Sequence, residues 1–319
     1  MRSVSTVISA RNLCKRFGEF TAVAGIDFDV APGESFGFLG PNGAGKTSTM
    51  RMIGCVSPIT SGTMRIFGLD PVQDGPAIRA RMGVVPQADQ LDSELTVVEN
   101  LVIYGRYFDI PRAECRRRAA ELLEFVQLSE RANERVDPLS GGMKRRLTIA
   151  RSLMSEPDLL LLDEPTTGLD PQARHILWDR LYRLKQRGVT LVLTTHYMDE
   201  AEQLCDRLVV MDGGCIVAEG SPRGLIEQHA TREVLELRLH RDALGDVAEA
   251  VDDSAAMASI GDIGDRQEVL PDRVLIYAYD GEAALAEVYR RGIEPVGSLV
   301  RRSSLEDVFL RLTGRTLID

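Results

Sequence analysis

Five short apolar runs, separated by stretches with a helical pattern, organise the first 220 residues. The runs are SFGFL, GVVP, LLLLD, TLVLTT and RLVVM. Continuous apolar runs of this length are typical of parallel strands that are buried on both faces of a sheet. The pattern therefore predicts an α/β domain around a parallel sheet. Short strand-like segments precede it in residues 1–30, and a hairpin, RLVVM–DGG–CIVAEG, closes it near Gly220.

A long stretch without strand signals lies between GVVP and LLLLD. Thr96 is placed to cap a helix whose apolar face carries Val97, Leu101 and Tyr104. Residues 112–128 repeat the helical period before Pro138 interrupts it. We therefore expect a helical insertion at about residues 90–155.

The pattern changes after SPRG, which marks a domain boundary near Gly220. VLELRLH and VLIYAYD alternate as strands do, whereas GEAALAEVYRRG and SSLEDVFLRLTG have the helical period. The order, roughly βαββαβ with a last helix, resembles a ferredoxin-like fold. We expect a first domain at 1–220 and a small α+β accessory domain at 221–319.

Charge and composition exclude several classes of function. The net charge is −10, and residues 221–319, with 12 basic and 19 acidic side chains, carry seven of those charges. An acidic chain does not fit a nucleic-acid partner, because backbone phosphates demand a basic face. No run approaches the roughly 18 apolar residues of a membrane span, and the start lacks the apolar stretch of a secretory signal. We expect a cytosolic chain whose membrane role, if any, needs another polypeptide.

The stretch GPNGAGKT follows the predicted strand SFGFL and opens a helix. It matches GxxxxGK[ST], in which glycine backbone N–H groups surround phosphate oxygens at the positive end of a helix. Lys46 would reach the outer phosphates, and the Thr47 hydroxyl would be a ligand of magnesium. The predicted nucleotide-binding residues of this loop are Gly40, Pro41, Asn42, Gly43, Ala44, Gly45, Lys46, Thr47 and Ser48.

Other polar residues follow predicted core strands. The run DLLLLDEP brings Asp163 and Glu164 to the carboxyl end of a strand, where open α/β sheets bind ligands. Asp163 would hold magnesium, and Glu164 would orient or deprotonate the attacking water. His196, after TLVLTT, could contact the γ-phosphate, and the Gln87 amide could be a ligand of magnesium. Taken singly, each has a structural alternative: a helix cap, a core histidine or a polar loop residue.

The stretch LSGGMKRR suggests a second anion site. Ser140, Gly141 and Gly142 stand at the start of a predicted helix, whose first N–H groups attract negative charge. The apolar face of that helix carries Met143, Leu147, Ala150 and Met154. Lys144, Arg145 and Arg146 are then expected on or beside its solvated side.

These motifs in this order resemble the nucleotide-binding subunit of ATP-binding cassette (ABC) transporters over roughly residues 4–220. The resemblance implies a phosphate-loop NTPase fold that binds ATP and Mg²⁺. It implies that GPNGAGKT is the Walker A motif, Gln87 the Q-loop residue, residues 140–143 the signature, Asp163 and Glu164 the Walker B pair, Asp170 the D-loop residue and His196 the switch histidine. Phe17 occupies the place of the aromatic residue that stacks on adenine. The common signature is LSGGQ, so Met143 is a departure.

The resemblance also implies roles and partners. Lys46, Glu164 and His196 would be catalytic, and Thr47, Gln87 and Asp163 would hold the metal. Each ATP would lie between Walker A of one subunit and the signature of another, in a homodimer or a paired cassette.

LSGGMKRR, the DEPTTGLD region and SSLEDVFLRLTGR are most similar to ATP-binding subunits of ABC-2-type exporters, in the drug-resistance and nodulation-factor (lipo-chitooligosaccharide) group. Such a subunit would lie peripherally on the cytoplasmic face of the bacterial inner membrane. It would dock a separate permease at roughly residues 87–110.

Three other functions are compatible with parts of the pattern. A soluble ABC ATPase without a transporter partner would usually carry two cassettes or a long coiled coil, and this chain has neither. A phosphotransferase with an acceptor substrate does not account for LSGGM and DEPTTGLD. A purely regulatory ATP-binding module does not need both Glu164 and His196.

Overall fold

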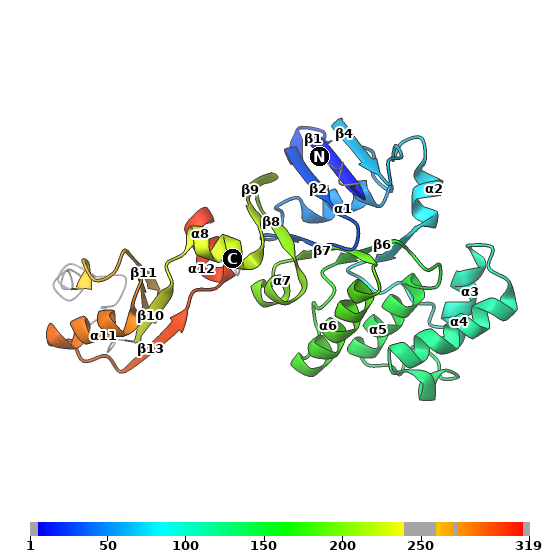
Figure 1. Ribbon diagram of the computed structural model, residues 1–319. Helices are drawn as coiled ribbons and strands as arrows, with labels where there is room; N and C mark the ends of the chain where they lie inside the picture. The colour runs from blue at the N-terminus through cyan, green and yellow to red at the C-terminus, as the bar shows by residue number, and fades with distance from the viewer. Residues whose placement is uncertain (1–5, 239–259, 271–272, 315–319) are drawn as a thin grey trace. The chain divides into compact units, whose positions relative to one another are not determined.

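The computed structural model describes residues 6–238, 260–270 and 273–314 (Figure 1). The chain divides into two compact units, the first ending at Pro222 and the second beginning at Arg223. None of the helices in the described part of the chain is long and apolar enough to cross a membrane.

A six-stranded sheet forms the centre of the first unit. In sheet order its strands are β5 (Met82–Val85), β6 (Leu159–Asp163), β7 (Thr190–Thr195), β3 (Ser35–Leu39), β8 (Arg207–Asp212) and β9 (Cys215–Gly220). All neighbours pair in parallel except β8 and β9, which form an antiparallel hairpin. The predicted parallel sheet is confirmed, and its strands β3 and β7 are buried at every residue.

A second, antiparallel sheet of the first unit packs against strand β3. It has the order β2 (Phe20–Val30), β1 (Ile8–Phe17) and β4 (Ser61–Ile66). Phe28 of β2 meets Phe38 of β3 edge to face at 5.1 Å between ring centroids, and Phe36 meets Phe38 at 5.3 Å. These buried aromatic contacts join the two sheets in one core. The helices α1 (Lys46–Ile53) and α2 (Gly75–Ala80) contribute Met50, Ile53 and Ile78 to it.

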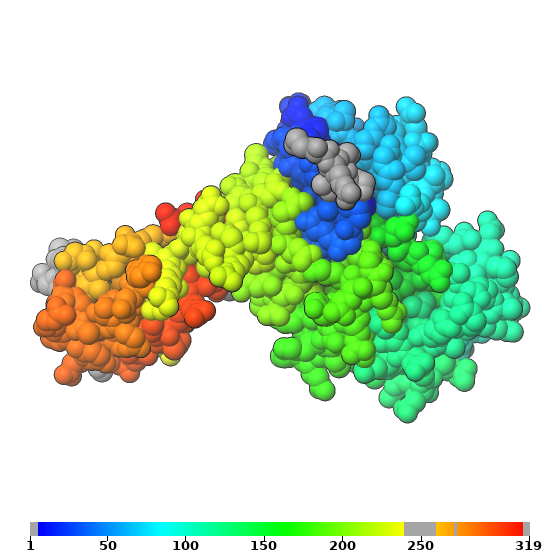
Figure 2. All heavy atoms as spheres, viewed as in Figure 1, coloured from blue at the N-terminus to red at the C-terminus, as the bar shows by residue number. Residues whose placement is uncertain are grey.

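The helical insertion has a core of its own. Its elements are α3 (Val97–Arg106), α4 (Arg112–Phe125), the short 3-10 helix η1 (Ser129–Arg131) and α5 (Gly141–Ser152). Leu101, Leu123 and Leu147, one from each α-helix, are fully buried together. In Figures 1 and 2 the cyan-green α3 and α4 form a lobe that the green α5 joins to the rest of the unit. Two further helices, α6 (Pro171–Gln186) and α7 (Met198–Leu204), follow β6 and β7.

The second unit is a four-stranded antiparallel sheet with helices on it. Its strand order is β11 (Arg266–Leu270), β12 (Arg273–Ala278), β10 (Glu233–Arg238) and β13 (Gly297–Arg302). If the strands are numbered along the chain, this order is 4-1-3-2 read from β13, which is the order that the predicted βαββαβ arrangement produces. The first predicted helix of that arrangement falls in residues 239–259, outside the described residues.

Among the described residues, three helices accompany this sheet: α8 (Pro222–His229), which begins at the last residue of the first unit, α11 (Gly281–Arg290) and α12 (Leu305–Thr313). Ala284 and Val288 of α11 pack on Leu235 and Ile276 of the sheet. Helix α12 begins with a capping box between Ser304 and Asp307. The Asp307 carboxylate also accepts two hydrogen bonds from Arg301 of β13, at 2.7 and 3.0 Å, so it ties this helix to the sheet.

The start of the helical insertion offers a stability test. Thr96 caps α3, accepting from the Glu99 N–H at 3.3 Å, while Glu99 accepts from the Thr96 N–H at 2.9 Å. Thr96→Ala should therefore cost about 1 kcal/mol and lower the melting temperature by roughly 3 °C. Thr96→Ser, which keeps the hydroxyl, is the control and should melt close to the parent. Equal melting of the alanine variant and the parent in calorimetry would contradict the capping role.

Candidate active site

The phosphate loop lies between β3 and α1, at the carboxyl edge of the main sheet. Gly45 has a left-handed φ of 100°, and a Cβ there would lie 2.4 Å from the Ala22 carbonyl oxygen, so this position requires glycine. Lys46 is buried, and its ammonium donates to the carbonyl oxygens of Gly40 at 2.7 Å and Pro41 at 3.0 Å. Burial lowers the pKa of Lys46, and Glu164 and Asp163 oppose that shift. The loop therefore holds the positively charged Lys46 ammonium against its own backbone carbonyl groups.

Asp163 ends β6 beside this loop. Its Oδ1 accepts a hydrogen bond from the Thr194 hydroxyl at 2.5 Å and lies 3.4 Å from the Thr47 hydroxyl. Thr194 belongs to the neighbouring strand β7, so the pairing of β6 with β7 sets the position of the carboxylate. Two oxygen-bearing side chains thus converge at the start of α1. Hydroxyl and carboxylate oxygens are the donors that Mg²⁺ prefers.

Glu164, the next residue, is the point where the other polar groups meet. It is 7% exposed and has a left-handed φ of 46°, a backbone conformation that costs energy in a non-glycine residue. Its Oε2 accepts from the Gln87 amide at 2.9 Å. Its Oε1 lies 3.2 Å from His196 Nδ1 and 3.9 Å from the Lys46 ammonium. The backbone turn directs the carboxylate into this set of contacts.

A cavity of about 210 Å³ lies at the loop. Gly43, Lys46 and Thr47 line it from the loop, and Gln87 and Glu164, which follow β5 and β6, line it from the other side, whereas Asp163 and His196 are not among its lining residues. Two residues that the motifs did not single out, Phe20 and Ala22, also line it. Phe20 follows β1 after a tight turn and begins β2, and an aromatic residue at that turn was the available sequence signal. Its ring is 62% exposed.

Phe17 does not line this cavity. It ends β1, is 53% exposed, and lies under the Lys15 ammonium at 4.8 Å from its ring centroid. Its stacking on adenine stays a prediction, and Phe20, across the same turn, is the aromatic residue that the structure places at the cavity.

The signature residues Ser140, Gly141 and Gly142 do not line the phosphate cavity. Ser140 caps α5 by accepting from the Met143 N–H at 3.3 Å, and both Ser140 and Gly141 are exposed. Gly142 packs closely on Ala173 of α6, the helix that Asp170 caps by accepting from the Ala173 N–H at 2.8 Å. The structure therefore leaves the signature and Asp170 next to each other on the surface, away from the loop of their own chain.

The predicted solvated position of Arg145 is wrong. The side chain is 3% exposed and points from α5 into the core. Its guanidinium donates to five backbone carbonyl oxygens at the end of β6 or just after β5 and β6: those of Pro86, Gln87, Asp163, Glu164 and Pro165. The distances to the last four are 2.8 to 3.3 Å. Burial lowers the pKa of this guanidinium, and Asp89, 3.7 Å away, opposes the shift. Helical periodicity missed this role because the carbonyl acceptors lie on other segments.

Taken together, the fold and the site define a phosphate-loop nucleoside-triphosphate hydrolase. The structure brings together Lys46, Thr47, Gln87, Asp163, Glu164 and His196 from four different segments. A positive loop, two converging side-chain oxygen atoms and a nearly buried carboxylate are groups that phosphoanhydride hydrolysis can use.

Comparisons with known proteins identify the family within this class. The ABC transporter family matches residues 23–167, and the C-terminal domain of nodulation factor export protein NodI matches residues 252–314. The Nod factor export ATP-binding protein I of Paraburkholderia xenovorans is 47% identical over 96% of this chain and 96% of its own. The protein of the same name from Rhizobium etli is 42% identical over 99% of this chain and 96% of its own.

Solved structures agree with the first unit. The ADP conformation of an ATP-binding cassette of an ABC transporter has a TM-score of 0.64 and 27% identity, over 70% of this chain and 94% of that one. A dimeric post-hydrolysis cassette bound to ADP and phosphate has a TM-score of 0.62 and 28% identity, over 67% of this chain and 98% of that one. The chain belongs to the ABC transporter family, as an ATPase subunit in the group of the Nod factor export ATP-binding protein I.

Substitution of Arg145 tests whether this side chain anchors the segments that carry Gln87 and Glu164. Arg145→Met should destabilise the first unit by about 3 kcal/mol, because it leaves several buried carbonyl groups without a donor. It should also reduce ATP turnover, because the segments that carry Gln87 and Glu164 lose their common anchor. Lys144→Met, on the same helix and only half buried, is the matched control. Chemical denaturation and steady-state ATPase would measure both effects, and identical behaviour of the two variants would refute the anchoring role.

Proposed function

We propose that this chain hydrolyses ATP with Glu164 as the general base, and that it thereby drives export through a separate permease. The observation that carries the catalytic part is the position of the Glu164 carboxylate. It is nearly buried and lies within 4 Å of Gln87, His196 and Lys46. A carboxylate there can take a proton from a water aligned with the γ-phosphate. Lys46 would stabilise the phosphate charge, and His196 would hold water and carboxylate in line.

The residues beside Glu164 fit a magnesium ion. Thr47 and Asp163 present oxygen atoms 3.4 Å apart, and Gln87, which donates its amide N–H to Glu164, keeps its amide oxygen available. Within the described ranges no cluster of three or more His, Cys, Asp or Glu side chains could hold a metal by itself. Such a site therefore suits an ion that takes its remaining ligands from phosphate and water. Bound Mg²⁺ supplies positive charge that neutralises the phosphate oxygens.

A head-to-tail pair of subunits accounts for the separate signature. Ser140 and Gly141 are exposed at the positive end of a 12-residue helix but do not reach the phosphate cavity of their own chain. In a homodimer they would meet the γ-phosphate held by the other subunit, together with Asp170. The similarity to a dimeric cassette bound to ADP and phosphate supports this arrangement. ATP would then join the subunits, and hydrolysis would release them.

The permease would dock in a groove beside Gln87, which we name the Gln87 groove. This cavity of about 460 Å³ is lined by Gln87, Gln90, Tyr104, Arg51 and Val84, among others. Tyr104 packs on Phe108 at 5.4 Å between ring centroids and still faces the groove, whereas Tyr107 is 79% exposed. A helix of an ABC-2-type permease seated here would sense the movement of Gln87 directly.

The cargo assignment rests on relatives over the full chain. Proteins named Nod factor export ATP-binding protein I match both units, and the NodI C-terminal domain matches the second unit separately. We propose a nodulation-type lipo-chitooligosaccharide or a similar amphipathic molecule as cargo, with the chain peripheral on the cytoplasmic face of the bacterial inner membrane. A soluble ATPase without a permease is disfavoured by the same full-length similarity.

Glu164→Gln tests the catalytic proposal. Glutamine preserves the shape and most hydrogen bonds of the side chain but cannot take a proton, so kcat should fall at least about 100-fold. ATP affinity should remain, because Lys46 and the loop are untouched. Glu130→Gln, at an exposed position on η1, is the control and should keep parental turnover. Turnover by Glu164→Gln near that of the parent would eliminate Glu164 as the base.

Ser140 tests the dimer proposal. Ser140→Asn and Ser140→Asp both keep a side-chain oxygen that can cap α5, so both should melt near the parent. The aspartate places a negative charge opposite the proposed γ-phosphate and should reduce ATP turnover at least about tenfold more than asparagine does. ATP binding by the monomer should be unchanged in both. Equal turnover of the two variants would argue against a signature that faces phosphate.

A further inference from the structure

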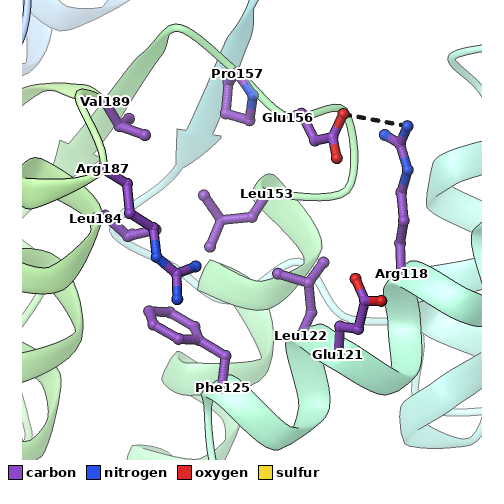
Figure 3. A pocket seen from close by; sticks show the side chains of 10 residues that line it. All are labelled: Arg118, Glu121, Leu122, Phe125, Leu153, Glu156, Pro157, Leu184, Arg187 and Val189. Atoms are coloured by element: carbon purple, nitrogen blue, oxygen red, sulfur yellow. Dashed lines mark ion pairs between the residues drawn. The ribbon is translucent and has the colours of Figure 1, made fainter.

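A second cavity in the first unit lies away from the phosphate loop. It lies between α4, the loop that follows α5, and the end of α6 (Figure 3). We name it the Arg187 cavity, after its position beside Phe125, Leu153, Leu184 and Arg187. Its volume of about 460 Å³ is within the range of small-molecule sites and exceeds the 210 Å³ of the phosphate cavity.

Apolar side chains form most of its wall. Leu153 and Leu184 are 6% and 4% exposed, and Leu122 of α4 stands beside them (Figure 3). Pro157 and Val189, which precede β6 and β7, complete the apolar part. Such a wall favours a ligand with an apolar body, since each buried methylene adds to the free energy of binding.

The charged residues around the cavity are unequally paired. Glu156 pairs with Arg118 at 3.2 Å, and Glu121 pairs with Arg117 at 2.6 Å. Arg187 has neither an ion pair nor a side-chain hydrogen bond with any residue that the structure describes. Arg187 is exposed, and its positive charge has no ion-pair partner among the described residues.

The phenyl ring of Phe125 holds that charge at the cavity. The Arg187 guanidinium lies 5.3 Å from the ring centroid, and Figure 3 shows it above the ring, beside the leucine side chains. On the same ring, Arg180 lies at 5.5 Å. Contact with an aromatic face limits the movement of a guanidinium without using its N–H donors. No described residue accepts a hydrogen bond from the Arg187 side chain, so its donors can serve a ligand.

We propose that the Arg187 cavity binds a small amphiphile with one carboxylate, of the medium-chain fatty acid class. The carboxylate accepts from Arg187, and the apolar chain lies against Leu122, Leu153 and Leu184. Arginine and carboxylate have matching planar geometry, which makes this pair stronger than a hydrogen bond between neutral groups. A cationic amphiphile of equal length lacks this pairing and meets an unpaired positive charge.

The site is independent of the nucleotide site. Pro157 and Val189 precede β6 and β7, so they lie at the amino edge of the sheet, whereas Asp163 and His196 follow the carboxyl ends of the same strands. Helix α5 spans the distance between the two edges: its 12 residues run about 18 Å from Ser140 toward Leu153. A ligand here therefore does not compete with ATP.

Calorimetric titration of the full-length chain tests the proposal, with decanoate kept below its micelle concentration. We expect one saturable site and an affinity for decanoate at least about tenfold higher than for butanoate or 1-decylamine. Arg187→Gln should weaken decanoate binding at least about tenfold. Arg183→Gln, on the same helix but outside the cavity, should leave the affinity unchanged. Melting temperature and ATPase of both variants should match the parent, which shows that they are folded.

Three results would overturn the proposal: no saturable binding of decanoate, equal affinity for decanoate and 1-decylamine, or equal affinity in the parent and Arg187→Gln. Lys46→Ala distinguishes the two sites further. It should bind decanoate as the parent does, and a loss of decanoate binding in this variant would place the ligand in the phosphate cavity instead.

Discussion

A buried guanidinium connects the parts of the active site. Arg145 needs hydrogen-bond acceptors because an unpaired charge in the core is very costly, and the carbonyl groups that follow β5 and β6 need donors for the same reason. Each satisfies the other, so the helix that begins at the signature is attached to the loops of Gln87 and Glu164. A displacement of any one of these segments breaks bonds in the other two. Under the proposed function, this mutual dependence would make a nucleotide signal at Glu164 available to the Gln87 groove and to Ser140.

The parallel sheet is the second feature on which the site depends. Strands that run in one direction end at one edge, so β3, β6 and β7 deliver the phosphate loop, the acidic pair and His196 to the same place. Burial of these strands on both faces holds their ends rigidly. The polar groups then act on one another across short distances, and Glu164 is close to an amide, an imidazole and an ammonium group. The proposed hydrolysis therefore depends on the carboxyl edge of the sheet, where these groups meet.

Much of the fold could be predicted because its signals are local. LLLLD became β6 and TLVLTT became β7 at the expected residues, since continuous apolar runs suit only a strand covered on both faces. Thr96 caps α3 as predicted, because a capping bond spans three residues. Arg145 was assigned to solvent, because periodicity describes one face of one helix and contains nothing about the carbonyl groups it meets. The adenine-stacking role of Phe17, which the resemblance implied, stays a prediction, and the structure places Phe20, across the same turn, at the cavity.

The amino-acid sequence by itself determined the types of elements, their order and the chemical groups of the phosphate loop and the acidic pair, because hydrophobic period and motif spacing are properties of neighbouring residues. Only the tertiary structure decided which polar groups meet. Gln87 reaches Glu164 across 77 residues of chain, and Arg187 lies beside Phe125 without an acceptor among the described residues. Such pairings depend on distances set by the packing of separate elements, and a charge is paired or unpaired only once those elements have docked.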